Sequence, residues 1–183
     1  QVMLSDIDIG KMPMYKRARL GISYLAQEAS IFRNLTVEEN IMSILEYVDE
    51  MDAAAKKKKL DDLLEEFHVT HVRERLGSEL SGGERRRVEI ARCLALEPKF
   101  ILLDEPFAGV DPIAVADIQG IISYLRERGM GILITDHNVV ETLRIVDRAY
   151  IMNAGKILVE GDVDTVLNDP MAIKYYIGNN TKL

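Results

Sequence analysis

Two short apolar runs on either side of an amphipathic helix constrain the fold more than any other feature of the sequence. Residues 100–103 are Phe-Ile-Leu-Leu, between Pro98 and Asp104, and residues 131–135 are Gly-Ile-Leu-Ile-Thr. Both runs suit strands buried on both faces. Between them, apolar residues recur at helical spacing over 113–127. This strand–helix–strand unit predicts an α/β domain with a largely parallel sheet.

The rest of the chain extends this pattern. Strands are expected at residues 2–4 and 21–25, and a hairpin at 149–159 with its turn at 153–156. Thr36 and Glu39 have the spacing of a capping box, which predicts a helix start. Further helices are expected at residues 13–20, 36–48, 53–67, 71–76, 84–96, 138–146 and 163–167, and after Pro170.

These elements are expected to form one domain over residues 1–183. Residues 1–35 and 81–183 would supply the α/β core with a C-terminal hairpin and helices, and residues 36–80 would form a helical insert.

Composition narrows the classes of function. The net charge is −7, which argues against a general nucleic-acid binder because such proteins are normally basic. A single cysteine excludes an intrachain disulfide. No apolar run approaches the roughly 20 residues that a membrane-spanning helix needs.

Two motifs suit phosphate chemistry. Ser81, Gly82 and Gly83 precede a predicted helix, and bare amides at a helix N-terminus are a natural site for phosphate oxygens. Read alone, the same motif is equally an ordinary helix start. Asp104 and Glu105 follow an apolar strand, where one acid could hold Mg²⁺ through water and the other could orient or deprotonate an attacking water. The alternative is a solvated acidic turn.

Three further residues are weak signals when taken singly. His137 follows the strand at 131–135, at the strand end that faces the ligand crevice in such sheets, although a lone histidine is more often structural. Gln27 follows another strand, and Asp111 precedes a helix as an ordinary turn residue would.

In order and spacing, these pieces resemble the nucleotide-binding subunits of ABC transporters over essentially all 183 residues. The resemblance implies a P-loop NTPase-type cassette with a helical signature subdomain, binding ATP and Mg²⁺. It further implies a role for each motif: Gln27 in the Q-loop, Ser81-Gly82-Gly83 in the signature, Asp104 in the Walker B strand, Glu105 as catalytic glutamate, Asp111 in the D-loop and His137 as switch histidine. Asp104 and Gln27 would be the metal ligands.

Three stretches are similar to the lipopolysaccharide-export ATPases of Gram-negative bacteria: residues 27–33, 81–92 and 105–112. That similarity implies a homodimer under two membrane permease subunits, on the cytoplasmic face of the inner membrane. Phe32 and Arg33 would then lie in the groove that receives a coupling helix, although Phe32 could instead be a simple loop anchor.

The sequence also departs from this branch. Ala26 stands where proline is usual, Val140 replaces an arginine, and Thr181 replaces an aromatic residue. More importantly, no Gly-x-x-x-x-Gly-Lys-[Ser/Thr] motif occurs in the 183 residues. We therefore expect the N-terminal strands and the P-loop to lie upstream of Gln1, and the fragment alone to be inactive.

Three other functions remain open at this point. The chain could be the ATPase of another ABC transporter, such as one for branched-chain amino-acid uptake. It could be a DNA-repair or chromosome-maintenance ATPase, although it shows neither a long coiled coil nor a basic surface. It could be a degenerate, non-catalytic partner, against which Glu105 and His137 argue.

Overall fold

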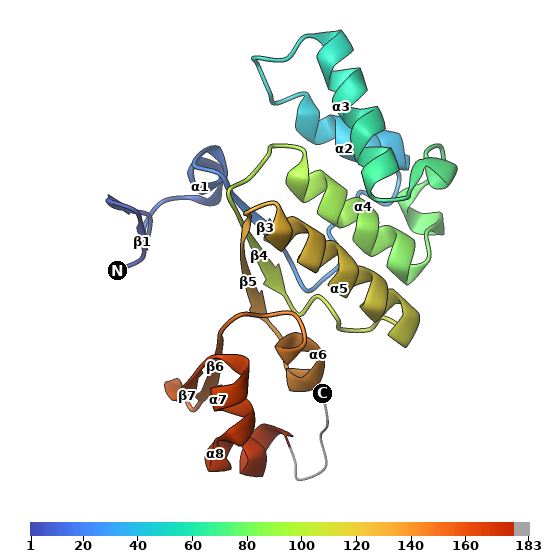
Figure 1. Cartoon of the computed structure of the whole chain (residues 1–183). Helices are drawn as coiled ribbons and strands as arrows, with labels where there is room; N and C mark the ends of the chain where they lie inside the picture. The colour runs from blue at the N-terminus through green and yellow to red at the C-terminus, as the bar shows by residue number, and fades with distance from the viewer. Residues whose placement is uncertain (178–183) are drawn as a thin grey trace. The chain divides into compact units, whose positions relative to one another are not determined.

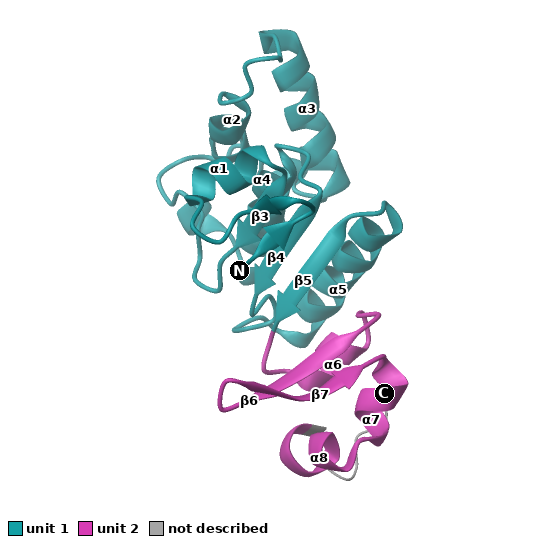
Figure 2. Ribbon diagram, turned by 90° about the vertical axis from the view of Figure 1, so that its left-hand side faces the viewer, with its two compact units in different colours: residues 1–135 teal, residues 136–183 magenta. Residues whose placement is uncertain are grey.

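The computed structural model describes residues 1–177 (Figure 1). Thr181, one of the departures noted above, lies outside the described residues. The chain divides into two compact units, residues 1–135 and residues 136–183 (Figure 2).

A three-stranded parallel sheet forms the centre of the first unit. Its strands are β3 (Ile22–Leu25), β4 (Phe100–Asp104) and β5 (Gly131–Thr135), in that spatial order. Register places Leu25 opposite Leu103, and Asp104 opposite Thr135. The predicted α/β class and the parallel pairing of the two apolar runs are confirmed.

Two helices, α4 (Gly82–Leu94) and α5 (Pro112–Glu127), pack beside each other on one face of this sheet (Figure 1). Ile101 and Leu103 point to the covered face and are buried. On the other face, Tyr24, Phe100 and Leu133 are 46%, 43% and 58% exposed. The prediction of strands buried on both faces is therefore wrong for the described residues, because the helices cover only one face.

Residues 36–80 are mostly helical, as expected. The capping box forms: the Thr36 hydroxyl accepts the Glu39 amide, and the Glu39 carboxylate accepts the Thr36 amide. The helices are α2 (Val37–Leu45), which ends three residues earlier than predicted, and α3 (Ala53–Glu66).

The helix predicted at residues 71–76 is wrong. Short 3-10 turns occur instead at Thr70–Val72 and Gly77–Glu79. Between them, the carbonyls of Arg73 and Arg75 accept the first amides of α2, from Glu38 and Val37. These bonds tie the segment to the start of α2, and the backbone between the two turns forms no regular helix.

The N-terminal residues form a small hairpin of β1 (Met3–Leu4) and β2 (Ile7–Asp8), followed by α1 (Met14–Arg19). Only the first strand and the helix were predicted. The second strand has two residues and too little pattern to be read from the sequence.

The second unit has its own small core. Its elements are α6 (Val139–Leu143), β6 (Ala149–Asn153), β7 (Lys156–Gly161), α7 (Val163–Asn168), α8 (Pro170–Ala172) and a π-helical turn at Ile173–Ile177. The side chains that cluster in this core are Leu143, Ile151, Val159, Val166 and Ala172. The hairpin is confirmed, with its turn at Ala154 and Gly155, both at positive φ. The helices α6 and α4 each end earlier than predicted, and α4 starts at Gly82 rather than Glu84.

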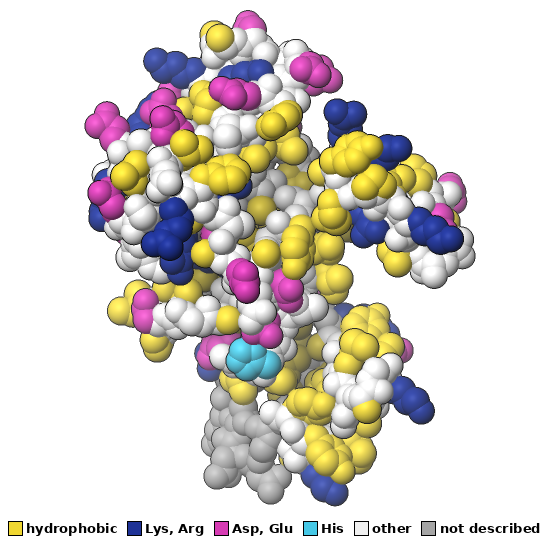
Figure 3. Space-filling model, turned by 180° about the vertical axis from the view of Figure 1, so that it is seen from behind, with side chains coloured by type: hydrophobic (Ala, Val, Ile, Leu, Met, Phe, Trp, Pro, Cys, Tyr) yellow, Lys and Arg dark blue, Asp and Glu magenta, His cyan; other side chains and the backbone are white. Residues whose placement is uncertain are grey.

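The surface is mixed in character. On the face shown in Figure 3, Lys and Arg side chains are scattered among acidic and apolar ones. Within residues 1–177, no helix has the length and apolar character required to cross a bilayer.

Candidate functional site

The carboxylate of Asp104 is held between two neighbouring strands. The Thr135 hydroxyl on β5 donates to its Oδ1 atom at 2.6 Å, and the Tyr24 hydroxyl on β3 donates to its Oδ2 atom at 3.0 Å. These bonds, that of Thr135 more than that of Tyr24, lower the pKa of Asp104. The group is therefore an anion at neutral pH, at the C-terminal end of the central strand.

Glu105 follows in a strained backbone conformation. Its φ is +42°, in the left-handed region that non-glycine residues rarely adopt. Its amide donates to the Thr135 carbonyl at 2.7 Å, and the Gln27 side-chain amide donates to its Oε2 atom at 2.8 Å. Strain of this kind clusters at functional sites. The structure thus brings Gln27 next to the adjacent acids Asp104 and Glu105.

The oxygen atoms at this position suit Mg²⁺. Asp104 offers a charged carboxylate. The side-chain nitrogen of Gln27 donates to Glu105, which leaves the side-chain oxygen of Gln27 able to bind a metal ion. Mg²⁺ usually keeps several waters and takes one or two protein oxygens plus phosphate oxygens. Within residues 1–177 no group of three or more His, Cys, Asp or Glu side chains could hold a metal. Such a group is not needed for a cation of this kind.

The Ser81-Gly82-Gly83 motif starts α4 with a complete capping box. The Ser81 hydroxyl donates to the Glu84 carboxylate at 2.7 Å and accepts the Glu84 amide at 3.3 Å. These contacts with Ser81 lower the pKa of Glu84. Gly82 and Gly83 are the first helical residues, and a Cβ at Gly82 would meet nothing within 4 Å. The Glu84 amide is thus capped by Ser81, whereas the amides of Gly82 and Gly83 have no partner within the helix, and the space beside the Gly82 Cα is open.

Asp111 caps the neighbouring helix. Its Oδ1 atom accepts the amides of Ile113 and Ala114, both at 3.0 Å. A Cβ at Gly83 would lie 3.4 Å from the Cβ of Ala114. The starts of α4 and α5 are thus adjacent, although the two motifs are 28 residues apart in the chain.

The loop after Gln27 is held by charged residues of α4 that were not predicted. Glu89 accepts the amides of Ser30 and Ile31 at 2.7 and 3.2 Å. Arg92 donates to the Ser30 carbonyl at 2.7 Å, and its guanidinium lies 4.6 Å from the centre of the Phe32 ring.

Phe32 is also fixed from the helical segment. The Asn40 side chain is fully buried, accepts the Phe32 amide at 2.9 Å and donates to the Phe32 carbonyl at 3.0 Å. The ring itself is 48% exposed, and the exposed Arg33 follows it. The backbone of this loop is therefore anchored while the Phe32 ring faces outward.

His137 belongs to the second unit. Its side chain is 74% exposed, and its Nδ1 atom lies 3.8 Å from Asp136, whose carboxylate also accepts the Asn138 amide at 2.7 Å. Within this unit His137 therefore precedes the start of α6 on a short turn.

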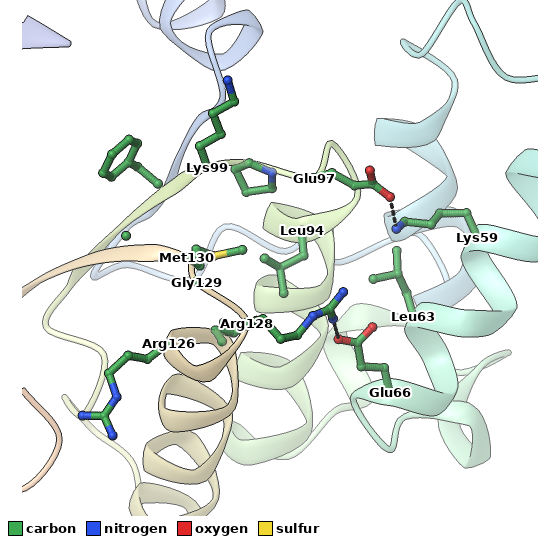
Figure 4. Close-up of a pocket in the computed structure, with 14 residues that line it drawn as sticks. Lys59, Leu63, Glu66, Leu94, Glu97, Lys99, Arg126, Arg128, Gly129 and Met130 are labelled. Atoms are coloured by element: carbon green, nitrogen blue, oxygen red, sulfur yellow. Dashed lines mark hydrogen bonds and ion pairs between the residues drawn. The ribbon is translucent and has the colours of Figure 1, made fainter. Parts of the chain in front are cut away.

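A pocket of about 810 Å³ lies at the opposite ends of the central strands, where β4 and β5 begin at Phe100 and Gly131 (Figure 4). Two ion pairs cross it, from Lys59 to Glu97 at 2.5 Å and from Arg128 to Glu66 at 2.7 Å. Since both carboxylates are paired and the acid pair is at the other strand ends, this pocket is separate from the candidate site.

Comparison with known proteins identifies the family. The family described as ABC transporter matches residues 1–108. A solved ATP-binding cassette of an ABC transporter, MJ1267, superimposes with a TM-score of 0.82 at 30% identity, over 96% of this chain and 76% of that one. The chain therefore belongs to the ABC transporter ATP-binding proteins, and its fold is that of the ABC ATPase cassette.

Two relatives carry a more specific name. The lipopolysaccharide export system ATP-binding protein LptB of Haemophilus influenzae is 56% identical over all 183 residues, which span 76% of its length. LptB of Escherichia coli K12 is 52% identical over 182 residues, again 76% of its length. The relatives are ATP-binding proteins, which agrees with the phosphate chemistry suggested by the acid pair Asp104-Glu105 and by the signature motif.

Proposed function

We propose that this chain is the ATP-hydrolysing part of a transporter that exports lipopolysaccharide from the inner membrane. The observation that carries the ATPase role is the convergence of Gln27, Asp104 and Glu105 at the end of β4. The similarity to two LptB proteins supports the choice of substrate.

In this proposal each side chain has a defined task. Asp104, held as an anion, and the amide oxygen of Gln27 are the groups that would hold Mg²⁺, which usually keeps several of its waters. The metal would neutralise charge on the phosphate groups. Glu105 orients the attacking water and accepts its proton. His137 would hydrogen-bond the γ-phosphate.

The signature motif serves a second subunit. In a homodimer, the open amides after Ser81 face the phosphates bound by the partner, and Asp111 lies next to that contact. The 183 residues contain no lysine-bearing phosphate loop. Two copies of residues 1–183 therefore build no complete site, and we expect no ATPase activity above background from them alone.

A mixed dimer with intact LptB of Haemophilus influenzae tests this arrangement. One complete site would combine the phosphate loop and acids of LptB with Ser81 of this chain. Titrating residues 1–183 into LptB should change the rate of ATP hydrolysis, by partial activity or by dominant inhibition. An unchanged rate at saturation would refute the shared site.

Two variants of the chain, used in the same titration, distinguish the contribution of Ser81 from that of Glu105. Ser81→Arg blocks the phosphate position and should remove the activity of the mixed site. Glu105→Gln should behave like the parent, because Glu105 faces the site that lacks a phosphate loop. Equal effects of both variants would contradict the assignment.

Export requires two permease subunits, and we place the chain beneath them on the cytoplasmic face of the inner membrane. The exposed ring of Phe32 and the neighbouring Arg33 would contact a coupling helix. Capture by the lipopolysaccharide-export permease of Haemophilus influenzae should fall in Phe32→Ala and Arg33→Ala, and persist in the control Tyr47→Phe, which removes only a hydroxyl from an exposed side chain. Capture by branched-chain amino-acid permeases instead would refute the substrate.

A further inference from the structure

Tyr24 has no task in the chemistry proposed above, yet its hydroxyl donates to Asp104. Its ring is 46% exposed and lies on the sheet face that α4 and α5 do not cover. Packing in the core therefore does not account for a tyrosine at this position. The hydroxyl of Tyr24 forms its hydrogen bond with the Asp104 carboxylate.

Strand register explains how the residue reaches that group. Tyr24 pairs with Leu102, two residues before Asp104 on the same face of β4. A side chain must therefore extend diagonally along the neighbouring strand, which a long aromatic ring can do. Thr135 stands directly opposite Asp104, so a short hydroxyl is enough there.

Each oxygen of the Asp104 carboxylate accepts one of the two hydrogen bonds. Thr135 donates to Oδ1 and Tyr24 donates to Oδ2, from strands on opposite sides of β4. An ionised carboxylate only accepts hydrogen bonds and has about four acceptor positions. Two hydroxyl donors fix its rotation and still leave acceptor positions on both oxygens.

We infer that Tyr24 and Thr135 are positioning residues that hold the Asp104 carboxylate in one rotamer, with its remaining lone pairs presented to a hydrated divalent cation. This inference rests on the proposed role of Asp104 in binding Mg²⁺. Partners that orient a metal-binding carboxylate typically change metal affinity by about 10- to 100-fold when they are removed.

The test uses residues 1–183, with Mn²⁺ as a paramagnetic probe for the cation. The variants are Tyr24→Phe with Thr135→Val, which remove both hydroxyls at nearly constant shape. Thr135→Ser in the otherwise parental chain keeps both hydroxyls and removes only a methyl group, and Tyr47→Phe is a matched control, since the Tyr47 side chain is 83% exposed. NMR three-bond couplings report the χ1 rotamers of Asp104, and Mn²⁺ broadening of the Glu105 amide reports cation affinity.

We expect one Asp104 rotamer in the parent, in Thr135→Ser and in Tyr47→Phe, and averaged couplings in the double variant. Apparent Mn²⁺ affinity should fall on the order of tenfold in the double variant alone. A double variant with one rotamer and parental affinity would overturn the inference. If Asp104→Asn left Mn²⁺ broadening unchanged, the proposed metal site would be wrong, and the rotamer couplings would still decide whether the two hydroxyls position Asp104.

Discussion

Replacing Glu89 by glutamine should destabilise the first unit by about 3 kcal/mol. Glu89 is 2% exposed and pairs with Arg86, itself 6% exposed, at 3.2 Å. The same carboxylate accepts the amides of Ser30 and Ile31. Glutamine keeps an oxygen for those amides but removes the charge that compensates the buried guanidinium.

The size of this stability loss depends on the hydrogen bonds that Arg86 keeps in Glu89→Gln. Its Nη1 atom also donates to the Ala26 carbonyl at 2.9 Å, whereas Nε and Nη2 have no partner within residues 1–177. Removing one member of a buried ion pair typically costs about 3–5 kcal/mol, because the other charge stays buried. The lower end applies because glutamine still serves the two amides.

Urea denaturation followed by circular dichroism measures the loss, and hydrogen exchange of the Ser30 and Ile31 amides locates it. The double variant Arg86→Met with Glu89→Gln should lose less than the sum of the two single variants, since no uncompensated charge remains. A loss below about 1 kcal/mol in Glu89→Gln, or strict additivity, would refute the reasoning.

Two further predictions concern neighbouring contacts. Asn40→Ala should cost about 2 kcal/mol in urea denaturation, because the Phe32 amide loses the acceptor that the fully buried Asn40 side chain provides, although the Phe32 carbonyl keeps the Leu35 amide as a donor; a change below about 0.5 kcal/mol would contradict this. The pKa of Glu84 is lowered mainly by the Ser81 hydroxyl. Its contribution to stability is therefore present above the usual glutamate pKa and is lost as pH falls through the lowered value. As pH falls from above the usual glutamate pKa through the lowered value, Glu84→Gln should lose less stability than the parent, and equal slopes would exclude the contact as a cause.

The sequence alone predicted those features that depend on residues close together in the chain. The helix caps at Thr36 and Ser81 depend on residues three apart, and the apolar runs at 100–103 and 131–135 depend on composition. The acid pair could be placed at a strand end for the same reason. Such features need no knowledge of which strands are neighbours.

Features that depend on pairing could not be read in this way. The bond from Tyr24 to Asp104 requires the register of β3 on β4, which no short motif reveals. The carbonyls of Arg73 and Arg75 bond to the start of α2, 35 residues or more away in sequence, which no local pattern at 71–76 reveals. One available signal was missed: Arg86, Glu89 and Arg92 recur at three-residue spacing, which places these charged side chains along one side of the helix.

One helix connects two ends of the first unit. The first turn of α4 carries the amides of Gly82 and Gly83. Its later turns carry Glu89 and Arg92, which form hydrogen bonds with the backbone of Ser30, and Arg92 also stacks on the Phe32 ring. The start of α4 and the outward-facing ring of Phe32 are therefore joined by one continuous set of contacts through a single helix.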